Sequence, residues 1–109
     1  MLAPLGVVAL VAVSVAITAA EAGPRPAATY TIVVDKMAFG PLPGGLHVGD
    51  TIVWVNRDLF RHSATAANRS FDVDLPAGKS ARLTLRRAGS LAFSCKYHPG
   101  MKGVLVIRN

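Results

Sequence analysis

The sequence predicts an antiparallel β-sandwich or barrel. After the N-terminal segment, the apolar runs are short and rich in β-branched or aromatic residues, as is typical of strands. Glycine- and proline-containing turns separate these runs about every 8 to 12 residues. No apolar pattern with a helical period persists over several turns. A chain of 109 residues has room for one such domain.

An apolar segment opens the chain. The first 20 residues carry no charged side chain, and residues 5–17 are almost entirely apolar. This length suits the apolar region of a secretory signal better than a membrane span of about 20 residues. Ala20 and Ala22 flank Glu21 in the small-residue pattern of a cleavage site. We therefore expect residues 1–22 to be a signal peptide, with an uncleaved membrane anchor as the alternative, and the remaining chain to be exported or periplasmic.

A linker and a strand-rich domain are expected next. Residues 23–28 contain two prolines and small side chains, which favour a linker, so the domain is predicted to span residues 29–109. Within it, the short apolar runs predict five strands, at Tyr30–Val34, Thr51–Val55, Ala81–Leu85, Leu91–Phe93 and Val104–Ile107.

Two of these strands carry a pattern that predicts how they face the core. Ala81, Leu83 and Leu85 alternate with polar residues and should point inward. Residues 104–107 are apolar at every position, which indicates a strand that is covered on both sides or lies at an edge of the sandwich. Trp54, in the middle of its strand, is expected in the core.

Charge and cysteine content exclude several classes of protein. The chain has 12 Lys and Arg against 6 Asp and Glu, a net charge of +6. The basic residues are scattered and not interleaved with aromatic residues, and export also argues against a nucleic-acid partner. A basic surface that aids solubility and one that steers an acidic partner both remain open. The single cysteine excludes an intrachain disulfide.

The sequence SCKYHPGMKG contains the chemistry-bearing motif. Cys95, His98 and Met101 form a Cys-x-x-His-x-x-Met pattern. Thiolate, imidazole and thioether are soft or borderline ligands that suit copper far better than magnesium or calcium. Zinc is the main competitor, but structural zinc sites use four Cys or His ligands and seldom a thioether.

The surroundings of this motif predict a complete copper site. Cys95 follows a predicted strand, and Pro99-Gly100 should form a tight turn that brings the three side chains together. His62, just beyond another strand, is the obvious fourth ligand. Two His and one Cys in a plane with a weak axial Met101 make a blue-copper arrangement. We expect His47 to be a surface residue.

These residues resemble the cupredoxins, most closely amicyanin and plastocyanin. The resemblance covers about residues 29–107 and includes HVGDTIVWVN, Asn56 six residues before the predicted ligand His62, the SFD turn and the final CKYHPGMKGVLVI. The spacing of the ligand loop is similar to that of amicyanin. The resemblance implies a Greek-key β-sandwich of seven or eight strands and one-electron transfer outside the cytoplasm. It also implies that one copper ion is bound, with ligands His62, Cys95, His98 and Met101.

Two positions depart from this family. Serine or threonine often follows the cysteine in these relatives and bonds to the asparagine that corresponds to Asn56, whereas Lys96 stands here. The resemblance therefore does not extend to that contact between the two ligand loops. Arg61 replaces a proline of the amicyanins, which makes the rim of the site more basic.

The sequence leaves three functions to compare. The first is a monomeric electron carrier, with His98 as the gateway and Leu42, Phe60 and Pro99 as an apolar docking surface. Basic residues would steer an acidic redox partner toward this surface, namely Arg57, Arg61, Lys96 and Lys102. Such a carrier would bind no nucleic acid and, once its signal is cleaved, no membrane.

The alternative is a periplasmic protein that binds copper for delivery or buffering, since the same ligands would serve it. An enzyme with Cys95 as nucleophile and a histidine base is disfavoured. No acidic residue is placed to orient the base, the domain is too small for a substrate cleft, and Met101 would have no role.

Overall fold

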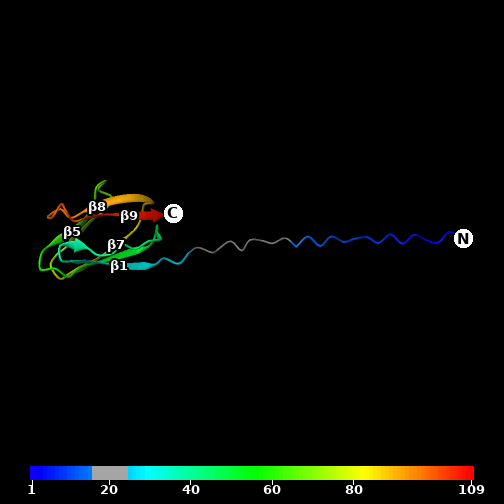
Figure 1. The fold of residues 1–109 in the computed structure, drawn as a ribbon, viewed down its shortest axis with the longest axis horizontal. Coiled ribbons are helices and arrows are strands. Elements are labelled where there is room, and N and C mark those ends of the chain that lie inside the picture. Colours follow the sequence, from blue (N-terminus) through cyan, green and yellow to red (C-terminus); the bar gives the residue numbers. More distant parts are fainter. Residues whose placement is uncertain (16–24) are drawn as a thin grey trace.

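The computed structural model describes residues 1–15 and 25–109 (Figure 1). Residues 1–15 are exposed and have no regular secondary structure. The predicted cleavage after Ala22 lies outside the described residues. In the described part of the chain, no helix is long and apolar enough to span a membrane.

Two β-sheets pack face to face, which confirms the predicted sandwich (Figure 1). The first sheet has the order β2 (Ala38–Phe39), β1 (Thr29–Asp35), β4 (Thr51–Asn56) and β7 (Ser80–Thr84). The second has the order β3 (Leu46–His47), β9 (Lys102–Arg108), β8 (Gly89–Ser94), β5 (His62–Ala66) and β6 (Asp72–Leu75). The described residues thus form nine strands, of which β2 and β3 have only two residues each.

The sheets are not purely antiparallel. β1 runs parallel to β4, with Ile32 opposite Trp54, and β3 runs parallel to β9. The other pairs are antiparallel, among them β8 with β9 and β5 with β6. The difference from the expected antiparallel sheets arises because the chain leaves β1, passes through β2 and β3, and enters β4 in its original direction.

Two strands differ in how well their buried faces match the sequence pattern. Residues 81, 83 and 85 pack against the core while their neighbours are exposed, as expected. In β9, Leu105 and Ile107 are buried, but Val104 and Val106 are 50% and 57% exposed. β9 is therefore not covered on both sides. It lies next to the short edge strand β3, and its outer face meets solvent.

β5 and β6 were not predicted. The sequence of β5, HSATA, shows no alternation because its first three residues are all buried, on both faces of the sheet. β6 does alternate, with Val73 and Leu75 buried and two aspartates exposed, but it is only four residues long. The pairing of His62 with Leu75 fixes the end of β5 from which the first predicted ligand projects.

An aromatic cluster fills the core beside the ligand-bearing end of β8. Trp54 is fully buried, as predicted, and its ring centroid lies 5.4 Å from that of Phe93. Phe39 packs edge-on against both rings, at 5.8 Å from Trp54 and 4.9 Å from Phe93. Because Phe93 lies two residues before Cys95, this packing fixes the strand that presents the thiol.

A buried carboxylate joins the expected linker to the domain. Asp50 is fully buried and accepts hydrogen bonds from the Arg25 guanidinium at 3.0 and 3.2 Å. It also accepts bonds from the backbone N–H groups of Ala28, at 2.8 Å, and His47, at 2.9 Å. The bond from Arg25 is the main cause that lowers the pKa of Asp50 to about 2, against the opposing effect of burial.

We expect Gly103→Ala to destabilise the sandwich by about 1 to 3 kcal/mol, because it overpacks the core. A Cβ at this position would lie 2.8 Å from Cζ of Phe93 and 3.0 Å from Cδ1 of Leu42. Urea unfolding measures the effect. Gly44→Ala is the matched control, since a Cβ there meets nothing within 4 Å. Equal stability of the two variants would contradict this account of the packing.

We expect Asp50→Asn to lower the free energy of unfolding at neutral pH by about 2 kcal/mol, because charge-assisted hydrogen bonds are lost. The carboxylate has a lowered pKa in the folded state, so its stabilising effect is complete above its ordinary pKa of 3.8 and disappears as the pH falls through about 2. Urea unfolding of wild type and variant at a series of pH values should show the difference shrinking over this range. A difference that does not change with pH would contradict the role of charge.

Candidate metal centre

Three of the four predicted ligands meet at one end of the sandwich. His62 is the first residue of β5, Cys95 follows β8, and His98 lies in the loop before β9. Their ligand atoms all lie within 4.8 Å of one another. The Cys95 Sγ is 3.8 Å from His62 Nδ1 and 3.7 Å from His98 Nδ1, and the two Nδ1 atoms are 3.2 Å apart. Figure 1 shows this loop at the end of the sandwich opposite the one where the chain enters β1.

The fourth predicted ligand, Met101, closes the same loop. It is buried, its backbone N–H donates to the His98 carbonyl at 2.9 Å, and its carbonyl accepts from the Cys95 N–H at 2.9 Å. The first of these bonds closes a turn around Pro99 and Gly100, as the sequence predicts. The loop therefore holds Cys95, His98 and Met101 by backbone hydrogen bonds.

The two ligand loops are joined, but not through Asn56. The backbone N–H of Lys96 donates to the Ser63 hydroxyl at 2.9 Å, which ties the residue after Cys95 to the residue after His62. The Asn56 amide instead donates to the carbonyls of Phe60, at 2.8 Å, and Leu75, at 2.9 Å. Ser63 was not singled out in the sequence, because a lone serine in a polar stretch carries no distinguishing pattern.

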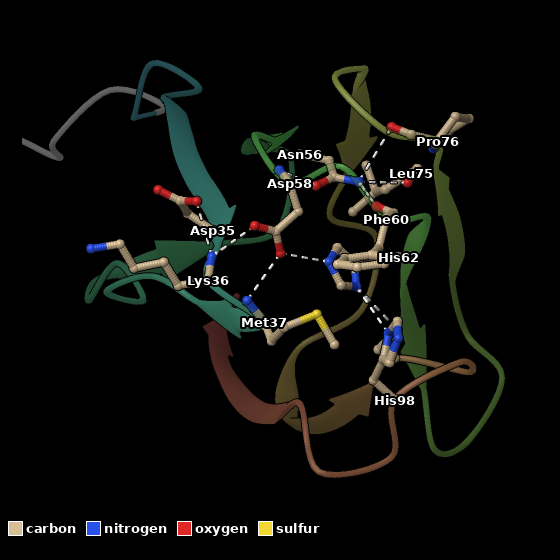
Figure 2. A network of polar contacts seen from close by, with 11 residues as sticks. Asp35, Lys36, Met37, Asn56, Asp58, Phe60, His62, Leu75, Pro76 and His98 are labelled. Atoms are coloured by element: carbon tan, nitrogen blue, oxygen red, sulfur yellow. Dashed lines mark hydrogen bonds and ion pairs between the residues drawn. The ribbon is translucent and has the colours of Figure 1, made fainter.

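A carboxylate supports the first ligand. Asp58 Oδ2 lies 2.7 Å from His62 Nε2, the ring nitrogen that points away from the other ligands (Figure 2). The backbone N–H of Met37 is the main cause that lowers the pKa of Asp58, burial opposes it, and the bonds from His62 and Lys36 add to the lowering. The sequence pattern gives no indication that Asp58 contacts His62. A spacing of four residues brings side chains together in a helix, and this segment is an irregular loop.

The thiol environment favours a thiolate. Burial raises the pKa of Cys95, but the neighbouring His62, the backbone of Ser63 and Tyr97, and His98 outweigh it and lower the pKa to about 6. Thiolate is the form of cysteine that binds metals. Together with two imidazoles and a thioether, it makes a donor set suited to copper.

His98 lies where the site approaches the surface. His62, Cys95 and Met101 are buried, whereas His98 is half-buried. The Phe60 ring, 60% exposed, packs edge-on beside it with a centroid distance of 6.4 Å. The exposed side chains of Leu59 and Tyr97 belong to the same two loops. Leu42, which was expected in this docking surface, instead packs partly against the core.

Acidic neighbours pair with half of the predicted steering residues. Lys96 forms an ion pair with Asp72 at 2.8 Å, and Arg61 forms one with Asp74 at 2.9 Å. In the described part of the chain, Arg57 and Lys102 form no ion pair. The basic rim is therefore less strongly charged than the sequence suggests.

Other candidate features lie away from the metal centre. A groove of about 500 Å³ between β6 and β7 is lined by Val73, Leu83 and Leu85 among others and contains none of the four predicted ligands. His47, the third histidine, is half-buried on β3, with its Nδ1 2.8 Å from the Gly45 carbonyl oxygen.

Comparisons with known proteins agree with the fold and the donor set. A cupredoxin-like domain family matches residues 6–107. A reduced Cu(I) form of an amicyanin variant at pH 4 is 26% identical, with a TM-score of 0.61, over 73% of this chain and 82% of the amicyanin. A search of functionally curated proteins gave no match.

A larger protein also contains a similar domain. A copper-containing nitrite reductase from Thermus scotoductus SA-01 is 26% identical, with a TM-score of 0.63, over 74% of this chain. The chain spans only 22% of that reductase.

The resemblance to the cupredoxins and to amicyanin is thus confirmed. Since the family match extends over most of the sequence, the chain belongs to the cupredoxin-like domain family.

Proposed function

We propose that this chain is a small exported type 1 copper protein that carries single electrons. The observation that carries the proposal is the convergence of two imidazole nitrogens and one thiol within 4.8 Å in a largely buried site. Met101, in the same loop, would be the weak axial ligand. Copper bound there would accept and release one electron as it cycles between Cu(II) and Cu(I).

The chain would keep its ligands in place during this cycle. His98 and Met101 lie in a loop closed by two backbone hydrogen bonds, and Ser63 joins this loop to β5. Buried, hydrogen-bonded ligands move little when the charge at the site changes, so little reorganisation accompanies electron transfer. The lowered pKa of Cys95 supplies the thiolate at neutral pH.

The exposed side of His98 is the expected route for the electron. Phe60 packs beside it, and Leu59 and Tyr97 expose further apolar surface on the same two loops, which suits weak and transient docking. The net charge of +6, with Arg57 and Lys102 near the ligand loops, supports an acidic redox partner. We propose that the protein acts as a monomer.

Residues 1–22 would direct the chain out of the cytoplasm, in agreement with their uncharged apolar sequence. We also propose that the chain is not itself an enzyme. The nitrite reductase that contains a similar domain is a much larger protein, of which this chain spans 22%.

The first test is copper binding. Adding Cu(II) to the purified protein should produce an intense visible absorption band from thiolate-to-copper charge transfer, and Cys95→Ser should abolish it. His47→Gln is the matched control and should leave the band intact, because His47 bonds to Gly45 on β3 and lies outside the ligand cluster. Absence of the band in wild type, or its persistence in Cys95→Ser, would refute the copper site.

The second test is electron exchange between Cu(I) and Cu(II) copies, measured by NMR line broadening. Phe60→Lys should slow it by about tenfold or more, because it places like charges face to face at the docking surface. Val106→Lys adds the same charge at a residue with a similar exposed fraction, 57% against 60%, on the outer face of β9. It should slow exchange much less.

The same preparation separates electron transfer from copper delivery or buffering. Fast exchange and slow loss of copper to a chelator are expected for a carrier. Slow exchange in wild type, combined with rapid loss of copper to the chelator, would contradict the proposed function and favour delivery.

A further inference from the structure

The Asp58–His62 contact defines which nitrogen of His62 is available to a metal. A neutral imidazole has one N–H donor and one acceptor nitrogen, and an ionised carboxylate only accepts hydrogen bonds. Since Asp58 Oδ2 lies 2.7 Å from His62 Nε2, the proton is on Nε2. The lone pair is then on Nδ1, the atom that lies 3.8 Å from Cys95 Sγ and 3.2 Å from His98 Nδ1.

Asp58 is itself held firmly in place (Figure 2). Its Oδ1 accepts from the backbone N–H of Lys36 at 2.8 Å, and its Oδ2 accepts from that of Met37 at 3.0 Å. Its own backbone N–H donates to the side chain of the buried Asn56 at 2.9 Å. These bonds oppose rotation of the carboxylate away from His62.

The turn that holds Asp58 is unusual in its backbone. Lys36 and Met37 both have a positive φ, 50° and 59°, which non-glycine residues rarely adopt. This conformation directs their two N–H groups to the same carboxylate. Positive φ at both residues is typical of the two-residue hairpin loop that joins β1 to β2, and here the amides of this turn fix the group that contacts His62.

We propose that Asp58 is a positioning residue for the copper site. It fixes His62 in the tautomer that binds metal through Nδ1, and its negative charge favours Cu(II) over Cu(I). This inference rests on the proposed function. Cu(II) carries one more positive charge than Cu(I), so a fixed anion behind a ligand stabilises the oxidised ion more strongly. Loss of the charge should therefore raise the reduction potential.

A purely structural role makes a different prediction. If Asp58 only anchored the turn at Lys36 and Met37, its substitution would lower stability and leave the reduction potential unchanged. Asp35 provides the comparison, because its Oδ1 accepts from the same Lys36 N–H at 2.9 Å. Asp35 has no hydrogen bond to His62 among the contacts of the described residues.

The experiment compares the full chain with Asp58→Asn, Asp58→Ala and Asp35→Asn. In Asp58→Asn the amide oxygen still accepts the proton of Nε2, so the tautomer is kept, while the charge and the bond from the Lys36 N–H are lost. Asp35→Asn is the matched control, because it alters the other acceptor of the same N–H and leaves the charge of Asp58 in place. We expect the preference for Cu(II) over Cu(I) to fall about tenfold in both Asp58 variants, a rise of about 59 mV for a one-electron couple. Asp35→Asn should change the potential much less. A potential in Asp58→Asn no higher than that in Asp35→Asn would overturn the role of charge.

The second measurement needs no copper. Nitrogen-15 NMR of the metal-free chain, recorded at alkaline pH with a neutral imidazole ring, should show His62 protonated on Nε2 in wild type and Asp58→Asn. Asp58→Ala should give a mixture of tautomers. A wild-type His62 protonated on Nδ1 would overturn the positioning role even if no variant folds. If copper produces no visible band but NMR shows His62 protonated on Nε2, the proposed copper function is refuted and the role of Asp58 in fixing the His62 tautomer is retained.

Discussion

The pairing of β5 with β8 is the interaction on which the candidate site depends. It places Thr65 opposite Ser94, so the start of β5 and the end of β8 lie at the same end of the sheet. His62 and Cys95, 33 residues apart, are thereby brought to one point. The bond from the Lys96 N–H to the Ser63 hydroxyl continues this pairing beyond the last ladder residues. If one of the two strands slipped by one residue against the other, His62 and Cys95 would point to opposite faces of the sheet, because side chains alternate along a strand.

Burying polar ligands in a small domain requires that their partners be buried and hydrogen-bonded too. Asn56, Ser63 and His62 are almost fully buried, and each has a hydrogen-bond partner in the described structure. An unpaired buried polar group would cost about 1 to 3 kcal/mol, a large part of the stability of such a domain. Supporting the ligands and preserving the fold are therefore the same physical requirement at this end of the sandwich.

Much of the architecture was predictable because local patterns report it. Alternation in residues 81–85 predicted a strand and its inward face, and the Pro99-Gly100 pair predicted the turn that closes the ligand loop. β5 was missed because both its faces are buried, which erases the alternation on which the prediction depends. The pairing of Arg25 with the buried Asp50 was not predicted either. The two residues are 25 positions apart, and the sequence of a linker does not show which distant carboxylate its arginine will contact.

The residue pattern alone predicted the class of fold and the candidate donor atoms, since strand periodicity and ligand chemistry depend on residue type and short spacing. The groups that support those candidate donors could be found only from the folded chain. Asp58 reaches His62 through an irregular loop, and Ser63 rather than Asn56 joins the two ligand loops. The fold also pairs Lys96 and Arg61 with two aspartates of β6. These contacts link residues whose proximity arises from chain folding, and no local periodicity encodes such distances.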